Sequence, residues 1–248
     1  MIRNSFHLQP QWLPSLVVVL LIPLFLSLGI WQLNRAEQKR EIKHLQLSRM
    51  NQAPLELSTN PSLNADQAEY RSIVAFGTLL PEKSILIENR KFRGRQGFHV
   101  VAPLRIAGDG RYLLINRGWI PASDNLKAPS FSTPEGLVTV IGRATRPTPP
   151  ALRLHRVIDQ EPGQHWPYLT LDEYREWSGL DLYPFLLLQT NDQESTFIRD
   201  WPLDAADDTM HIGYAIQWFA FAVIALGIWL KLSLVHSVDQ REAINGNH

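Results

Sequence analysis

The sequence predicts a membrane-anchored α+β protein, in which two transmembrane helices flank a mainly antiparallel β domain that carries a short helix. Two apolar runs, residues 13–33 and 212–234, are each long enough to cross a hydrocarbon core of roughly 30 Å at about 1.5 Å per residue. The segment between them alternates short β-branched and aromatic runs with turn residues, which is typical of β-hairpins. Because this segment is long enough to bury a core, we expect one domain between the spans.

The first apolar run predicts an uncleaved membrane anchor. Residues 13–33 contain no charged side chain, and Asn34 and Arg35 follow instead of the small residues of a signal-peptide cleavage site. Pro23 removes one backbone hydrogen bond, a defect that membrane helices tolerate when a neighbouring helix compensates. We therefore expect a partner helix. After the span, residues 34–68 are expected to form a helical stalk and then a linker rich in proline and asparagine.

The predicted extramembrane domain covers residues 69–208, and a tail at 235–248 follows the second span. The expected strands share a short length and a high content of β-branched or aromatic residues; they are residues 71–80, 84–88, 98–106, 112–120, 136–143 and 183–190. Glycines within 93–97 and 108–110 predict tight turns, because glycine adopts the positive φ that such turns need. Residues 170–178 predict a short helix that ends at Gly179.

Composition and motifs exclude several functional classes. The 24 basic and 24 acidic residues argue against a nucleic-acid-coating surface. The absence of cysteine excludes disulfides, thiolate metal sites and cysteine nucleophiles on this chain. There is no glycine-rich phosphate loop, no His-Glu-x-x-His helix and no Gly-x-Ser-x-Gly elbow. Asp207 and Asp208 are interpreted as helix-start charges rather than as a catalytic pair, so we expect no enzyme.

Among the histidines, His211 has the most informative position, because it opens the second apolar run. A titratable ring at a membrane boundary costs desolvation and often has a function, so haem or partner binding and plain interfacial anchoring are both open. By contrast, His99, His155 and His165 lack ligand spacing and are interpreted as surface or hydrogen-bonded residues. Tryptophans near the spans, namely Trp31, Trp218 and Trp229, also fit an interfacial aromatic belt.

Four stretches of the sequence, taken in order, resemble a known family. They are residues 29–35 (Gly-Ile-Trp-Gln-Leu-Asn-Arg) with 69–71 (Glu-Tyr-Arg); 97–104 (Gly-Phe-His-Val-Val-Ala-Pro-Leu) with 115–121 (Ile-Asn-Arg-Gly-Trp-Ile-Pro); the stretch from 165–166 (His-Trp) to 183–185 (Tyr-Pro-Phe); and 211–219 (His-Ile-Gly-Tyr-Ala-Ile-Gln-Trp-Phe). One such motif alone would be weak evidence for a family. Four motifs in the same order, together with matching membrane spans, are specific evidence. The chain resembles the surfeit-locus (Surf/Shy) family of cytochrome c oxidase assembly factors over nearly its full length.

This resemblance implies an anchor in the bacterial inner membrane, with a periplasmic domain and both termini in the cytoplasm. It implies assistance with haem a binding or delivery to subunit I of a haem–copper oxidase. Carried over to this sequence, His211 would be the haem-associated ligand, with Trp31, Gln32 and Arg35 facing it from the first span. Arg35 has two interpretations, as a partner of a haem propionate, which guanidinium binds bidentately, or as an interfacial anchor.

The same resemblance suggests residues for partner binding. In the domain these are Arg117, Gly118 and Trp119, for which a turn with a packed tryptophan is the favoured alternative. At the start of the second span the candidates are Tyr214, Gln217 and Trp218. A competing function is a cofactor-free scaffold that holds oxidase subunit I or haem A synthase, and a homodimer would supply a second haem ligand. A membrane-anchored hydrolase fits poorly, because no nucleophile–base pair is visible.

Two features depart from the expected pattern. Thr209 stands where an asparagine often precedes the histidine by two positions, which affects only local hydrogen bonding. The charge asymmetry opposes a periplasmic domain, because a single basic residue, Arg3, precedes the first span. The basic residues that follow this span are Arg35, Lys39, Arg40, Lys43 and Arg49. The basic segment is part of the shared family pattern, so the predicted orientation follows the family.

Overall fold

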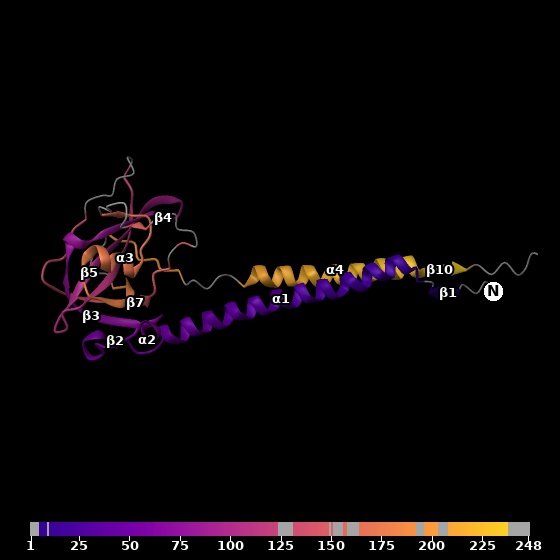
Figure 1. Ribbon diagram of the computed structural model, residues 1–248, viewed down its shortest axis with the longest axis horizontal. Helices are drawn as coiled ribbons and strands as arrows, with labels where there is room; N and C mark the ends of the chain where they lie inside the picture. Colours follow the sequence, from indigo (N-terminus) through magenta and orange to yellow (C-terminus); the bar gives the residue numbers. More distant parts are fainter. Residues whose placement is uncertain are drawn as a thin grey trace, which may run out of the picture. The chain divides into compact units, whose positions relative to one another are not determined.

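The computed structural model describes residues 5–8, 10–123, 131–148, 150, 156–157, 164–191, 196–202 and 208–237, and Figure 1 shows its helices and strands. The chain forms two compact units, one comprising Met1–His44 with Asp204–His248 and the other Leu45–Leu203. The first unit is mainly helical with a two-stranded sheet, and the second contains the eight-stranded sheet. Two long apolar helices that flank a β domain with short helices confirm the predicted fold class.

The helical unit is built from α1 (Trp12–Met50) and α4 (Thr209–Ser233). Each helix contains a window that is long and apolar enough to cross a membrane, and only 6% and 11% of these windows are buried. A core helix of a soluble protein would be mostly buried, so this exposure favours contact with lipid. Since α1 continues to Met50 without a break, the stalk is part of the first helix.

The two helices run antiparallel beside each other (Figure 1). Near the start of α1, Ser15 Oγ accepts a hydrogen bond of 2.9 Å from Nε1 of Trp229, which lies near the end of α4. At the same end of the unit, β1 (Ser5–Leu8) pairs antiparallel with β10 (Leu234–Ser237). The sequence pattern does not predict these strands, because each depends on a partner at the opposite end of the chain.

The second unit contains a five-stranded barrel that is closed by pairing between the two barrel strands that come first in the chain. Around the ring the order is β3 (Ser72–Leu79), β7 (Leu137–Thr145), β9 (Leu182–Gln189), β6 (Tyr112–Pro121) and β5 (Arg95–Ile106), which pairs again with β3. All pairs in the ring are antiparallel except β6 with β9. The mainly antiparallel sheet expected from the sequence is therefore a barrel.

Shorter elements extend the sheet beyond the ring. Strand β4 (Ile85–Phe92) pairs with β5, while β8 (His165–Trp166) pairs with β4 and β2 (Leu55–Glu56) pairs with β3. The β4–β5 hairpin turns at Arg93 and Gly94, whose φ values of 46° and 79° suit a two-residue turn of the predicted kind. Two short 3-10 helices are η1 (Leu57–Thr59) and η2 (Pro81–Lys83).

Two short helices cover parts of the barrel. Helix α3 (Leu171–Ser178) begins after its N-cap Thr170 and ends at Gly179 in the left-handed conformation, which matches the predicted short helix. Helix α2 (Ala65–Ala68) has a capping box formed by Asn64 and Gln67. Leu57 is fully buried in the barrel core, so the segment expected to be a linker contributes to the domain.

Candidate functional site

The seam between α1 and α4 is formed by small and aromatic residues. A Cβ atom on Gly29 would lie 2.5 Å from Cε1 of Phe219, so glycine at this position lets the aromatic ring lie against the α1 backbone. Phe25 stacks on Trp218 with ring centroids 5.8 Å apart. Alanines are buried along the same seam, namely Ala36, Ala215 and Ala222. Close packing of this kind fixes the rotation of each helix and therefore which side chains face each other.

His211 and Gln32 face each other across the seam. Nδ1 of His211 lies 2.7 Å from Oε1 of Gln32. An amide oxygen only accepts hydrogen bonds, so with Gln32 in this orientation Nδ1 carries the proton. In a neutral imidazole, Nε2 then retains the lone pair that metal ligation requires. Proteins commonly orient metal-binding histidines by such a contact at the other ring nitrogen.

The other two residues predicted to face His211 contact each other. The Arg35 guanidinium lies over the ring of Trp31, 5.8 Å from its centroid, and Nη1 of Arg35 donates to Gln38 Oε1 at 3.1 Å. Both Trp31 and Arg35 are exposed within the chain. Gln32 is therefore brought to the histidine, whereas Trp31 and Arg35 form a cation–aromatic pair on the outer surface of the same turn.

Sequence analysis missed an ion pair close to His211. Nε of Arg40 on α1 lies 2.6 Å from Oδ2 of Asp208, the residue that precedes α4. Asp208 is the N-cap of α4, as expected of a helix-start charge, but its side chain makes no capping hydrogen bond. The available signal was that Arg40 follows Gln32 by eight residues, a spacing that returns to nearly the same face of a helix.

The partner-binding candidates on α4 differ in exposure. Tyr214 and Gln217 are exposed, whereas Trp218 packs against α1 through its stacking on Phe25. An exposed amide within a helix that is apolar enough to cross a membrane has no water to pair with in hydrocarbon. The partner-binding role of these residues stays a prediction.

In the barrel, the Asn-Arg-Gly-Trp segment of β6 forms a bulge against β5. Val100 pairs with Gly118 and Val101 pairs with Asn116, so Arg117 is the additional residue. A bulge redirects the side chain of the unpaired residue. Arg117 is only 2% exposed although it is charged, which requires that its guanidinium find partners inside the fold.

The guanidinium of Arg117 donates hydrogen bonds to two neutral oxygens and lies over an aromatic ring. Nη1 donates to Oγ1 of Thr133 at 2.9 Å, and Nη2 donates to the carbonyl of Ser132 at 3.0 Å. The guanidinium carbon also lies 4.5 Å from the ring centroid of Phe197. These contacts attach two segments to the bulge, one before β7 and one after β9.

We call residues 196–202 the strap, because this segment pairs antiparallel with β6 at Trp119 and is hydrogen-bonded to the bulge. Trp119 and Ile198 exchange two backbone hydrogen bonds of 2.8 and 2.9 Å. Arg199 Nε donates to the carbonyl of Arg117 at 2.9 Å, and Trp119 Nε1 donates to the carbonyl of Arg90 at 2.9 Å. Arg117 and Trp119 thus pack and hold the strap, and their predicted contact with a partner protein stays a prediction.

His99 also lies beneath the strap. Its ring meets Trp201 edge to face at 5.4 Å, and its Nδ1 lies 3.3 Å from Nδ2 of Asn116. Burial, together with the smaller effect of the nearby Arg90 guanidinium, lowers the pKa of His99 to about 4. The imidazole is therefore neutral at pH 7, and its contact with Asn116 agrees with the interpretation of His99 as a hydrogen-bonded residue.

The pKa of His99 predicts a loss of stability in mild acid. The unfolded chain takes up this proton near pH 6.5 and the folded chain only near pH 4, so the stabilisation is complete above pH 6.5. As the pH falls to 4, about 3 kcal/mol of unfolding free energy should be lost. Urea unfolding at several pH values between 7 and 4 measures this loss. His99→Gln should show a smaller slope of unfolding free energy against pH, because the contribution of His99 is absent. Identical slopes in both proteins would contradict it.

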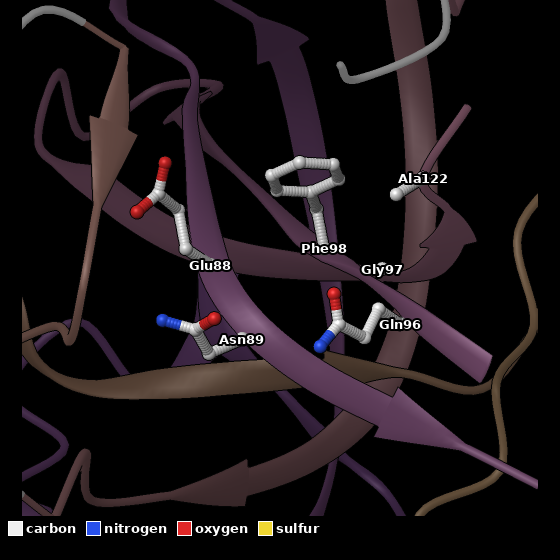
Figure 2. A pocket seen from close by; sticks show the side chains of 6 residues that line it. All are labelled: Glu88, Asn89, Gln96, Gly97, Phe98 and Ala122. Atoms are coloured by element: carbon white, nitrogen blue, oxygen red, sulfur yellow. The ribbon is translucent and has the colours of Figure 1, made fainter. Parts of the chain in front are cut away.

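A small polar pocket is lined by residues of β4 and β5 and by Ala122, which follows β6 (Figure 2). Its volume is about 200 Å³, and it is lined by Glu88, Asn89, Gln96, Gly97, Phe98 and Ala122. Ligand pockets usually enclose roughly 300–1,000 Å³ with largely apolar walls, so this pocket suits a small polar group rather than haem. Glu88 at its edge contacts Nδ1 of His165 at 3.0 Å. In the described part of the chain, no three His, Cys, Asp or Glu residues gather as a metal site.

Comparison with known proteins agrees with this architecture. A family model described as the SURF1 family matches residues 19–223, which is most of the chain. A SURF1-like protein of Rickettsia felis is 28% identical over 230 positions, covering 87% of this chain and 95% of the relative. A SURF1-like protein of Caenorhabditis elegans is 27% identical over 252 positions, with coverage of 89% and 74%. An uncharacterized SURF1-like protein of Mycobacterium tuberculosis is 28% identical, with coverage of 90% and 83%.

Proposed function

Because this chain belongs to the SURF1 family of cytochrome oxidase assembly factors, we propose that it binds haem a between its two membrane helices and delivers it to oxidase subunit I. Family membership supports the assembly role, and the resemblance found in the sequence agrees with it. The haem-binding step is the further part of the proposal. The contact between His211 and Gln32 is the observation on which this step depends.

The side chains at the α1–α4 seam suit the binding of haem as cargo. Haem iron is commonly held by a histidine nitrogen, and the Gln32 contact at Nδ1 leaves Nε2 of His211 available for this role. The chain contains no cysteine that could supply a thiolate ligand. Arg35 lies on the next turn of α1 and presents an exposed guanidinium, which suits a haem propionate.

A carrier must also release its cargo. His211 would hold the iron through one nitrogen, and one protein ligand holds iron less tightly than two. Transfer to subunit I then requires the loss of one nitrogen ligand and the contacts of one arginine. The outer surface of the same helices presents Tyr214 and Gln217, which would contact the receiving subunit.

We place α1 and α4 in the bacterial inner membrane, with the barrel in the periplasm and both termini in the cytoplasm. The two apolar helices and the bacterial relatives support a membrane location. Pairing of β1 with β10 supports a shared side for the two chain ends. The excess of basic residues after the first span opposes this orientation, and here we follow the family pattern.

A cofactor-free scaffold that holds subunit I or haem A synthase is the second candidate. The exposed Gln217 favours it, because an amide in hydrocarbon gains from a hydrogen bond to a neighbouring membrane helix. In this function the aromatic and polar residues of α4 would bind the partner directly, and His211 would only position the helix.

Haem content after purification distinguishes these two functions. The full chain is expressed with and without haem A synthesis, purified in detergent, and examined by reduced-minus-oxidised spectra and pyridine haemochrome assay. The proposed carrier should contain haem a in the first preparation, approaching one haem per chain or per dimer. Protein without haem a in both preparations, with retained binding of subunit I, would establish the scaffold function instead.

A further inference from the structure

Arg40 and Asp208 connect the two helices near the His211–Gln32 contact, on the side of the start of α4. Arg40 lies about two turns beyond Gln32 along α1, and the intervening Ala36 is 2% exposed in the seam. Asp208 is three residues before His211 and immediately precedes the first turn of α4. The distance between Arg40 Nε and Asp208 Oδ2 is 2.6 Å, which is short for a charge-assisted hydrogen bond.

The carboxylate of Asp208 is used differently from that of most aspartates at this position. An N-cap aspartate usually accepts a hydrogen bond from a backbone N–H of the first turn, which stabilises its own helix. Asp208 has helical dihedral angles, with φ −74° and ψ −15°, and makes no such bond. Its carboxylate instead contacts a residue of the other helix, so it fixes the start of α4 against α1.

We propose that Arg40 and Asp208 are positioning residues, and that their ion pair acts as a latch holding the first turn of α4 on α1. The latch keeps His211 opposite Gln32. As far as it concerns haem, this inference rests on the proposed function, since opening the latch would let His211 move away from Gln32 and speed haem release. Glu37, which lies 3.7 Å from Arg40 on the same helix, does not connect the two helices.

The latch is expected to be weak enough to open repeatedly. The side chains of Arg40 and Asp208 are 48% and 28% exposed, so solvent and salt screen their attraction. Exposed pairs of this kind change an equilibrium by roughly two- to five-fold. A change of this size suits a carrier, because the seam can open without the loss of the remaining α1–α4 contacts.

A thiol introduced into the seam measures the latch without haem. The chain has no cysteine, so Ala215→Cys gives a single reactive thiol at a position that is 1% exposed and one turn beyond His211. In the haem-free protein, Arg40→Ala and Asp208→Asn should each accelerate labelling by a maleimide roughly two- to five-fold. High salt should accelerate labelling of the parent and have little effect on the Arg40→Ala protein.

Two controls separate the latch from a general loss of structure. Glu37→Gln removes a charge next to Arg40 but no link between helices, and it should leave the labelling rate unchanged. The exchanged pair Arg40→Asp with Asp208→Arg should return the rate toward that of the parent. Equal labelling rates in the parent, Arg40→Ala and Asp208→Asn would overturn the latch, as would failure of the exchange to restore a rate that the single changes had raised.

Haem retention provides the second measurement, made with Ala215 restored. Transfer of haem a to excess apomyoglobin should be faster from Arg40→Ala than from the parent, by a factor similar to the labelling effect. Unchanged haem transfer with accelerated labelling would overturn the role of the latch at His211. A parent protein that contains no haem a would instead overturn the proposed function, while the labelling experiment would still decide whether the latch exists.

Discussion

Replacing His211 with alanine is expected to remove haem a from the purified protein while leaving the protein folded and in the membrane. The variant loses the nitrogen that Gln32 orients, and no cysteine elsewhere in the chain can replace it. Residues that support a metal ligand typically contribute about 10–100-fold to affinity. We therefore expect Gln32→Ala to weaken haem binding within that range and His211→Ala to weaken it by more.

The measurement is haem a per protein, from difference spectra recorded at equal protein concentration. His44→Ala is the matched control, because His44 lies exposed on α1 outside the seam and should leave the haem content unchanged. Membrane insertion should be the same in all these variants, since each replaces a polar side chain with alanine and makes neither α1 nor α4 less apolar. Equal haem content in wild type and His211→Ala would refute ligation by this residue.

Replacing Gly118 with alanine should cause a large loss of stability in the barrel. Gly118 has a φ of 135°, a conformation that residues with a Cβ rarely adopt. Its Cβ would also lie 2.8 Å from Cβ of Phe197 and 2.9 Å from the carbonyl oxygen of Ile198, two atoms of the strap that cannot rotate away. Strain and overpacking each cost about 1–3 kcal/mol, so we expect a loss of about 3 kcal/mol or more.

For a chain of this length, such a loss lowers the melting temperature by about 6–12 °C, which circular dichroism in detergent can detect. Gly108→Ala is the matched control, because Gly108 also has a positive φ, 83°, but has open space around its Cβ position. The difference between the two variants measures the collision with the strap. Equal melting temperatures for Gly118→Ala and Gly108→Ala would show that the strap is not held closely at this residue.

The sequence predicted those parts of the fold that depend on local pattern. The apolar runs defined the cores of α1 and α4, and the glycines near 94 and 108 marked turns whose φ values are indeed positive. Thr170 and Gly179 bound α3 through capping interactions that involve only neighbouring residues. In these elements a few adjacent side chains determine the backbone conformation.

Features that depend on distant pairs could not be derived in this way. Closure of the barrel requires that β3 pair with β5 as well as with β7, and no periodicity in either strand encodes this choice. Leu57 was assigned to a linker because its neighbours are polar and proline-rich, yet it is buried in the core. Arg117 was a candidate for partner binding, and only the bulge in β6 explains how a charged side chain can be buried.

The same limit applies to the candidate site. His211 was singled out because it opens an apolar run, and Gln32 because it belongs to a motif that resembles a family pattern. Their hydrogen bond joins residues 179 positions apart, so its existence depends on how α1 and α4 pack. The ion pair between Arg40 and Asp208 depends on the same packing, which explains why the sequence did not reveal it.

The separation of His211 from Gln32 along the chain also sets an order of events during synthesis. Helix α1 leaves the ribosome first, while α4 follows only after every strand of the barrel has been made. The barrel can therefore fold while the groove beside Gly29 is still unfilled and Gln32 still lacks its partner. Arrival of α4 completes the helix pair, so the contact between His211 and Gln32 can form only after the whole barrel and the start of α4 have been translated.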